Sequence, residues 1–158
     1  MRTQAGSSCL APLARRNDRD SLLHSLDRIF LLWNTTAMAW EVEFTDEFAE
    51  WWDSLDEGEQ EDVGASVKVL RECGPTLGRP HADLVAMSAY PNMKELRTQH
   101  DGRPYRTLFA FDPRRIAILL IGGDKTGNDR WYLEFVPRAD KIYAEHLRQL
   151  WKEARNKQ

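Results

Sequence analysis

Residues 92–127, NMKELRTQHDGRPYRTLFAFDPRRIAILLIGGDKTG, contain three consecutive predicted β-strands. The strands cover residues 92–100, 103–112 and 114–122, and each pair is joined by a short turn that contains Asp with Gly or Pro. Turns of this length join antiparallel neighbours. The last strand is apolar on both faces, so we expect it to lie in the centre of a sheet with both faces covered.

The segment before this stretch predicts one strand and two helices. Residues 40–44 alternate apolar side chains with glutamates, which is typical of a half-buried strand. Thr45 is a suitable N-cap for a helix that continues to about Leu55. A capping-box pattern at residues 56–59 starts a second helix, which the Gly-Pro pair at 74–75 ends.

A long helix is predicted at the C-terminal end of the chain. Apolar residues recur at helical spacing from Val136 to Ala154, with Pro137 near the first turn or at a kink. The predicted order of elements is therefore β, α, α, β, β, β, α. This order indicates a small α+β sandwich, in which an N-terminal helix pair and a C-terminal helix pack on a mainly antiparallel sheet.

The glycine-rich stretch LIGGDKTG resembles a phosphate-binding loop but lacks its spacing. A phosphate-binding loop ends in a Gly-Lys pair with another glycine five residues before it. Here Asp124 precedes Lys125, so the stretch contains no such pair. The intervals between the glycines do not match a dinucleotide-binding pattern either. We expect the strand to end at Ile121 and to turn through glycines of positive φ, which places Lys125 at a strand end.

Charge is divided unevenly along the chain. The net charge is −3, yet residues 38–67 hold 11 acidic residues and no Lys or Arg. Residues 68–158 hold 17 Lys and Arg against 11 Asp and Glu. The basic part is suited to facing an anion, whereas the acidic helix pair reads as a solvated surface.

Composition excludes several kinds of protein. The longest apolar run, residues 116–121, is too short to cross a membrane. Two cysteines and four histidines show no metal-ligand spacing, so we expect no metal and no cofactor. With 158 residues, a single domain in a reducing cytoplasm is expected.

The first 37 residues differ from the rest. Residues 1–20 have no periodicity and are predicted to be poorly ordered, whereas residues 22–33 have the spacing of a short amphipathic helix. The clear strand–helix pattern begins at Met38. We therefore treat residues 38–158 as the domain and residues 1–37 as an extension, with the hypothesis that translation starts at Met38.

Candidate site residues follow from strand alternation. Arg97 shares one strand face with Glu95, and Arg106 shares a face with Leu108. If the aromatic face of the strand 103–112 packs on the helices, Arg106 points across an open side, where Arg97 and Lys125 can join it. Three fixed cations suit a phosphodiester. The alternatives are a Glu95–Arg97 pair along the strand and simple solvated cations.

For other titratable residues, a non-catalytic role is the alternative to a catalytic one. His100 in the hairpin turn is a candidate general acid or base, although a histidine in a turn is usually solvated. Tyr143 and His146 on the last helix read as residues at the edge of the core.

The stretch 93–127, followed by FVPRADKIYAEHL, resembles the RelE/HigB-like toxins of bacterial type II toxin–antitoxin modules, in particular their phage-related branch. The matching features are the Glu-Leu-Arg at 95–97, the Tyr-Arg at 105–106, the apolar strand and the lysine after it. The resemblance implies a compact microbial RNase-like fold. It also implies cleavage of mRNA, typically on the ribosome, by attack of a 2′-hydroxyl on the adjacent phosphate.

The resemblance further implies partners and residue roles. A cognate antitoxin with a helix-turn-helix would inhibit the toxin and carry the only contact with operator DNA. Arg97, Arg106 and Lys125 would bind the phosphate of the RNA, with Arg103 as a further RNA ligand, and His100 or Tyr105 would move protons.

Two classes of function stay open on the sequence. The first is a metal-independent endoribonuclease toxin in the cytoplasm. The second is a non-catalytic protein-binding module on the same scaffold. A short neighbouring gene for a helix-turn-helix protein would favour the first.

Overall fold

The computed structural model describes residues 39–158. The proposed N-terminal extension, its helix at 22–33 and the start at Met38 lie outside the described residues. Within the described part, no helix is both long enough and apolar enough to span a membrane.

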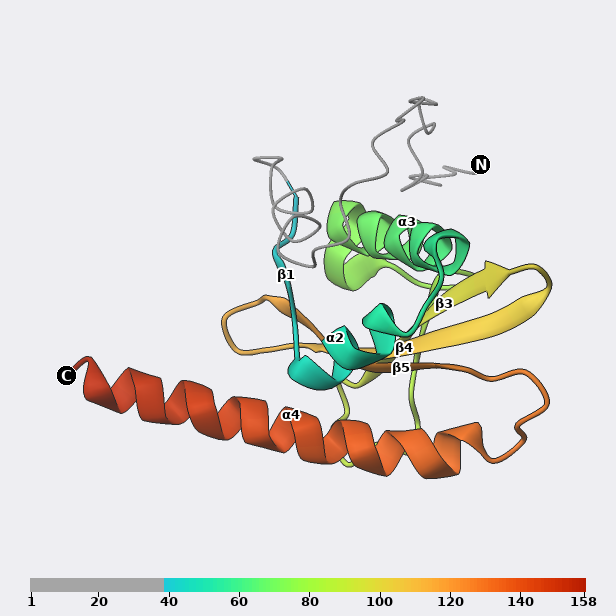
Figure 1. The fold of residues 1–158 in the computed structure, drawn as a ribbon. Helices are drawn as coiled ribbons and strands as arrows, with labels where there is room; N and C mark the ends of the chain where they lie inside the picture. The colour runs from blue at the N-terminus through green and yellow to red at the C-terminus, as the bar shows by residue number, and fades with distance from the viewer. Residues whose placement is uncertain (1–38) are drawn as a thin grey trace, which may run out of the picture.

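A five-stranded sheet with the order β1-β5-β4-β3-β2 forms the middle of the molecule (Figure 1). β1 pairs with β5 in parallel, and the other neighbours are antiparallel. The bounds of the strands are Val42–Phe44 for β1, Ala82–Leu84 for β2, Lys94–His100 for β3, Arg103–Phe111 for β4 and Ala117–Asp124 for β5.

Helices cover both faces of the sheet. α2 (Asp46–Asp53) and α3 (Glu57–Cys73) lie on one face, and α4 (Trp131–Asn156) crosses the other (Figure 1). A short 3₁₀ turn, η1 (Gly74–Thr76), follows α3. The sheet therefore separates two apolar cores, and β5 contributes Leu119 to the first and Ile118 to the second. The α+β sandwich and the central, doubly covered strand predicted from the sequence are confirmed.

The helix starts follow the predicted capping chemistry. The Thr45 hydroxyl accepts a hydrogen bond from the Phe48 amide at 3.3 Å. The Asp56 carboxylate accepts from the Glu59 amide, and the Glu59 carboxylate accepts from the Asp56 amide, both at 2.8 Å. This reciprocal pair is the capping box that the sequence predicts.

Three features of the fold differ from the sequence prediction: one unpredicted strand and two shifted element ends. β2 was not predicted, because its three residues Ala-Asp-Leu contain no β-branched or aromatic side chain and do not continue an alternating pattern as β1 does. α4 begins at Trp131, five residues before the first predicted position, so Pro137 lies inside the helix. β5 does not end at Ile121 but continues to Asp124.

Gly122 and Gly123 lie within β5 and serve close packing instead of a turn. Neither has a positive φ, whereas Gly127 beyond them has φ 65°. A Cβ atom on Gly122 would lie 2.2 Å from the Trp51 ring, and one on Gly123 would lie 2.8 Å from Nε1 of Trp131. The two glycines therefore let an aromatic ring from each helical layer reach the backbone of β5.

Gly122→Ala is expected to lower the free energy of unfolding by about 1–3 kcal/mol, because Trp51 must leave its position against the sheet. Gly78→Ala is the matched control, since a Cβ atom there meets nothing within 4 Å. Chemical denaturation of both variants measures the difference. Equal stability of the two would show that Trp51 repacks without cost.

Candidate nucleic-acid interface

Two arginines lie directly opposite each other on neighbouring strands. In the antiparallel pairing of β3 and β4, Arg97 is the partner of Arg106, and Arg106 is in turn the partner of Gly123 on β5. Both side chains point to the face covered by α4, because Arg97 alternates with Leu96 of the first core and Arg106 with Tyr105. The register thus places Arg97 and Arg106 together, as the sequence predicts.

The face that holds Arg106 is not open. The Arg106 side chain is only 6% exposed, and its Nε lies 3.7 Å from the carboxylate of Glu95, which is also buried. Its Nη1 donates to the Tyr105 carbonyl at 2.9 Å. The prediction of an open side was wrong in this respect, because the N-terminal end of α4, which starts earlier than predicted, covers it.

Tyr132, in the first turn of α4, connects this cluster. Its hydroxyl donates to Glu95 at 2.6 Å, and the Nζ of Lys125 lies 5.4 Å from the centre of its ring. Burial and the hydrogen bond to Glu95 raise the pKa of Tyr132 above its ordinary value of 10.0. We call Glu95, Arg97, Arg106, Lys125 and Tyr132 the cationic cluster.

Sequence reasoning missed Tyr132, because the start of α4 was placed after it.

Arg97 and Lys125 are half-buried, and within residues 39–158 neither is ion-paired to a carboxylate. The turn that carries Lys125 is fixed by two contacts: its amide donates to the Pro104 carbonyl at 2.8 Å, and Asp124 accepts from the Thr126 amide. Two accessible cations thus flank a buried third one.

The other predicted site residues lie on the opposite face of the sheet, against α3. His100 contacts Asp62 at 2.6 Å, and the Tyr105 hydroxyl donates to Glu59 at 2.6 Å. Arg103 pairs with the same Glu59 at 3.1 Å. The sheet therefore divides the predicted site into two groups, and the carboxylates around the second group repel a phosphate.

Tyr105 and Glu59 shift each other's pKa in opposite directions. Burial and the bond to Glu59 raise the pKa of Tyr105 well above 10.0, so it stays a neutral phenol near pH 7. The same hydrogen bond is the largest cause that lowers the pKa of Glu59. A buried, neutral hydroxyl with a fixed acceptor fits a structural role better than proton transfer.

The hydrogen bond to Asp62 raises the pKa of His100 above 6.5, and Asp101 adds to this shift. A raised folded-state pKa means that the stability from this pair is fully present below about pH 6.5 and is lost as the pH rises through the folded-state pKa. An NMR titration of the His100 ring is expected to show this elevation. Asp62→Asn should move the pKa back toward 6.5, and an unchanged pKa would contradict the assignment.

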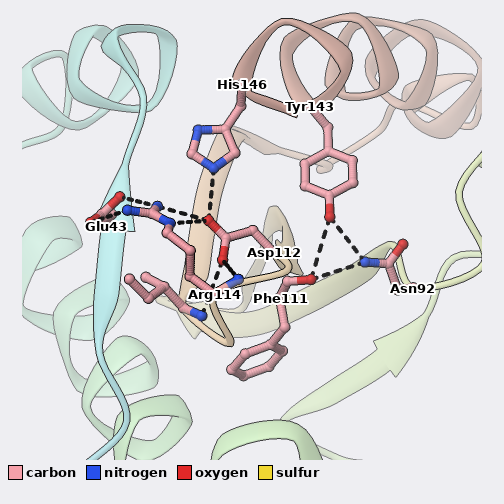
Figure 2. A network of polar contacts seen from close by, with 8 residues as sticks. Glu43, Asn92, Phe111, Asp112, Arg114, Tyr143 and His146 are labelled. Atoms are coloured by element: carbon pink, nitrogen blue, oxygen red, sulfur yellow. Dashed lines mark hydrogen bonds and ion pairs between the residues drawn. The ribbon is translucent and has the colours of Figure 1, made fainter. Parts of the chain in front are cut away.

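A third polar network lies at the turn between β4 and β5 (Figure 2). The fully buried carboxylate of Asp112 contacts His146 of α4 at 2.9 Å and Arg114 at 2.7 Å. Arg114 also reaches Glu43 on β1 at 2.7 Å. Nearby, the Tyr143 hydroxyl and Asn92 both donate to the Phe111 carbonyl. These groups satisfy one another and tie β1 and α4 to the turn, which agrees with the reading of Tyr143 and His146 as residues at the edge of the core.

Among the residues that the structure describes, no three His, Cys, Asp or Glu side chains gather as ligands for a metal ion. The cationic cluster itself contains one carboxylate against three cations.

Comparisons with known proteins identify the family to which the chain is similar. A family model described as "Phage derived protein Gp49-like (DUF891)" matches residues 50–144. The Mycobacterium tuberculosis protein named "Putative toxin HigB2" is 44% identical over 126 residues, which cover 78% of this chain and 61% of the relative. "Putative toxin HigB3" of the same organism is 49% identical over 92 residues, which cover 58% of this chain and 79% of the relative.

The chain thus spans less than two thirds of the first relative's length and more than two thirds of the second's. No solved structure gives a significant match. The family match covers α3, all of β2 to β5, and α4 as far as Ala144, and so includes the whole cationic cluster.

Proposed function

The chain belongs to the phage-derived Gp49-like family, with HigB-type toxins among its relatives, and from this premise we propose that it is the toxin of a type II toxin–antitoxin module that cleaves mRNA. The cationic cluster is the proposed RNA site. The accessible Arg97 and Lys125 would contact the phosphate directly. Arg106, which Tyr132 covers, would contribute its positive charge from the buried side of the site.

The observation that carries the proposal is the direct opposition of Arg97 and Arg106. Like charges opposite each other on antiparallel strands are unfavourable, because their Cβ atoms are only about 5 Å apart. Glu95 offsets the charge of Arg106. Arg97 interacts with the carboxylate of Asp83, but Arg79 already pairs with that carboxylate at 2.6 Å, so the compensation of Arg97 is shared. A bound phosphate would remove the repulsion, so the pair is suited to an anion.

The proposed reaction uses the RNA's own nucleophile. The 2′-hydroxyl attacks the adjacent phosphorus and gives its proton to water, while the bond to the 5′-oxygen of the next nucleotide breaks and that oxygen takes up a proton from water. The products are a 2′,3′-cyclic phosphate and a 5′-hydroxyl end. The negative charge on the phosphoryl oxygens grows in the transition state, and fixed cations stabilise it. Since the cluster offers no strong base apart from the paired Glu95, we propose that the ribosome positions the 2′-hydroxyl.

The relatives imply an antitoxin partner in general terms. We propose that this antitoxin carries a helix-turn-helix, that operator DNA is contacted only through it, and that the toxin acts in the cytoplasm. We also propose that cleavage needs no metal and no cofactor. His100, Arg103 and Tyr105 are assigned to the structure of the α3 face, not to the RNA site.

Induction of the full chain in bacteria, with primer extension on a reporter mRNA, tests the proposal. Wild type is expected to arrest growth and to produce new mRNA ends. Arg97→Ala/Lys125→Ala should abolish both effects. Arg138→Ala/Lys141→Ala, which removes the same charge from exposed positions of α4, should not.

Two further comparisons define the activity. Cleavage of RNA by the purified protein in the presence of a chelator tests metal independence. Comparison of the cleavage of free RNA with the cleavage of mRNA on ribosomes tests the need for the ribosome. Absence of arrest and of new ends with wild type would favour a non-catalytic binding module.

A further inference from the structure

The C-terminal part of α4 extends beyond the domain (Figure 1). The last buried residue of the helix is Tyr143, although the helix continues to Asn156. Residues 144–156 therefore bury no side chain completely, over a length of about 20 Å. Helices gain most of their stability from packing of an apolar face, so a segment of this length is marginal without a partner.

The exposed segment carries a continuous apolar stripe. Leu147, Leu150, Trp151 and Ala154 follow the i, i+3, i+4, i+7 spacing of one helix face. Leu147 contacts the second core, but the Trp151 side chain is 71% exposed. Together with Pro113 of the β4–β5 turn, these residues line a groove of about 580 Å³.

Positive charge borders the stripe. Arg148, Lys152 and Arg155 lie at helical spacing along one edge. Residues 144–158 contain four Lys and Arg against Glu145 and Glu153, an excess of two positive charges. Glu145 pairs with Arg148, so Lys152 and Arg155 carry the excess on this edge, while Glu153 and Lys157 line the groove on the other. A partner that fits must therefore present apolar side chains bordered by carboxylates.

We propose that this stripe is the docking surface for an amphipathic helix with acidic flanks, supplied by the antitoxin. The identity of the partner rests on the proposed function; the surface and its chemistry rest on the structure alone. An exposed tryptophan in an apolar groove is a typical anchor of such an interface, and a helix laid into a groove is a common mode of recognition.

Two other occupants fit less well. A second copy of the chain would bring the same excess of positive charge to the interface, which disfavours self-association. RNA would be attracted by the charge, but three of the four stripe residues are aliphatic and offer no ring for base stacking.

Calorimetric titration of the full chain with a synthetic helical peptide tests the surface. The probe is a 21-residue peptide with a leucine stripe bordered by glutamates, and the comparison peptide carries lysines in their place. The glutamate peptide is expected to bind, and the lysine peptide at least tenfold more weakly. Trp151→Ala should weaken binding at least thirtyfold, which is the effect of losing an anchor residue.

Two variants are the controls. Trp151→Phe should retain binding within about fivefold, because an aromatic anchor remains. Leu133→Ala removes a side chain that is 54% exposed on the N-terminal part of the same helix and should change nothing. Equal binding of the two peptides, or full binding by Trp151→Ala, would overturn the proposal.

The alternative occupants give distinct results. A dimer in analytical ultracentrifugation that Trp151→Ala dissociates would assign the surface to a second copy. Binding of a 20-nucleotide RNA that Trp151→Ala abolishes would assign it to nucleic acid. Either result would overturn the antitoxin proposal.

Growth assays separate this inference from the proposed function. Trp151→Ala is expected to arrest growth as wild type does, because it lies away from the cationic cluster, but to escape a co-expressed antitoxin. If no variant arrests growth while the peptide still binds through Trp151, the toxin proposal fails and the docking surface stands. If growth arrest occurs and the antitoxin neutralises Trp151→Ala as it does wild type, the docking surface fails alone.

Discussion

Arg106→Lys is expected to lower the rate of mRNA cleavage by about a hundredfold, measured as the appearance of new ends by primer extension. Lysine keeps a positive charge beside Glu95 but loses the planar fork of donors, one of which holds the Tyr105 carbonyl. Arg106 is therefore proposed to act through its fixed geometry and not through charge alone.

Lysine is a more informative substitution than alanine, because alanine would change both the cleavage rate and the stability of the fold. Arg106→Ala leaves Glu95 buried without its cation, and breaking a buried pair in this way costs about 3–5 kcal/mol. The thermal midpoint of Arg106→Lys should fall by only a few degrees, since the loss of the hydrogen bond to the Tyr105 carbonyl costs about 1 kcal/mol. Wild-type cleavage by a folded Arg106→Lys protein would remove Arg106 from the proposed site.

Asp112→Ala is expected to reduce the free energy of unfolding by about 3–5 kcal/mol, because it leaves Arg114 and His146 without their shared acceptor. The same carboxylate accepts from the amide of Ile116, so the β4–β5 turn also loses a bond. Urea denaturation measures the loss. His146→Gln keeps a donor on α4 and should cost much less.

The Asp112 network also sets a dependence on pH. Burial alone would raise the pKa of Asp112, but the hydrogen bonds from His146 and Arg114 outweigh it and lower the pKa below 3.8. A lowered folded-state pKa means that this stability is present above about pH 4 and is lost as the pH falls through the folded-state value. Wild type should therefore lose stability below pH 4 more steeply than Asp112→Ala.

The sequence predicts the parts of the fold that depend on local chemistry. Thr45 and Asp56 cap their helices as expected because capping needs only neighbouring residues. The parallel pairing of β1 with β5 was not predicted, because it joins Val42 to Ala117 and no local pattern reports it. β2 was not predicted either, because Ala82–Leu84 lacks the β-branched and aromatic residues that mark a strand.

The candidate site shows the same division. Alternation along the strands correctly places Arg97 and Arg106 on one face. The prediction put His100 and Tyr105 at the same site, whereas both lie on the opposite face against α3. Alternation does not tell which helix covers each face, so the cover provided by Tyr132 could not be foreseen. Tertiary packing, and not propensity, decides the accessibility of Arg106.

The parallel contact between β1 and β5 constrains the order in which the chain can fold. The Thr45 hydroxyl donates to the Leu120 carbonyl, 75 residues further along the chain. During synthesis, β1 and α2 therefore emerge long before the strand that supports them. Such non-local pairing slows folding, since a long loop must close before its contacts form. A nascent chain would reach its native sheet only after β5 has left the ribosome.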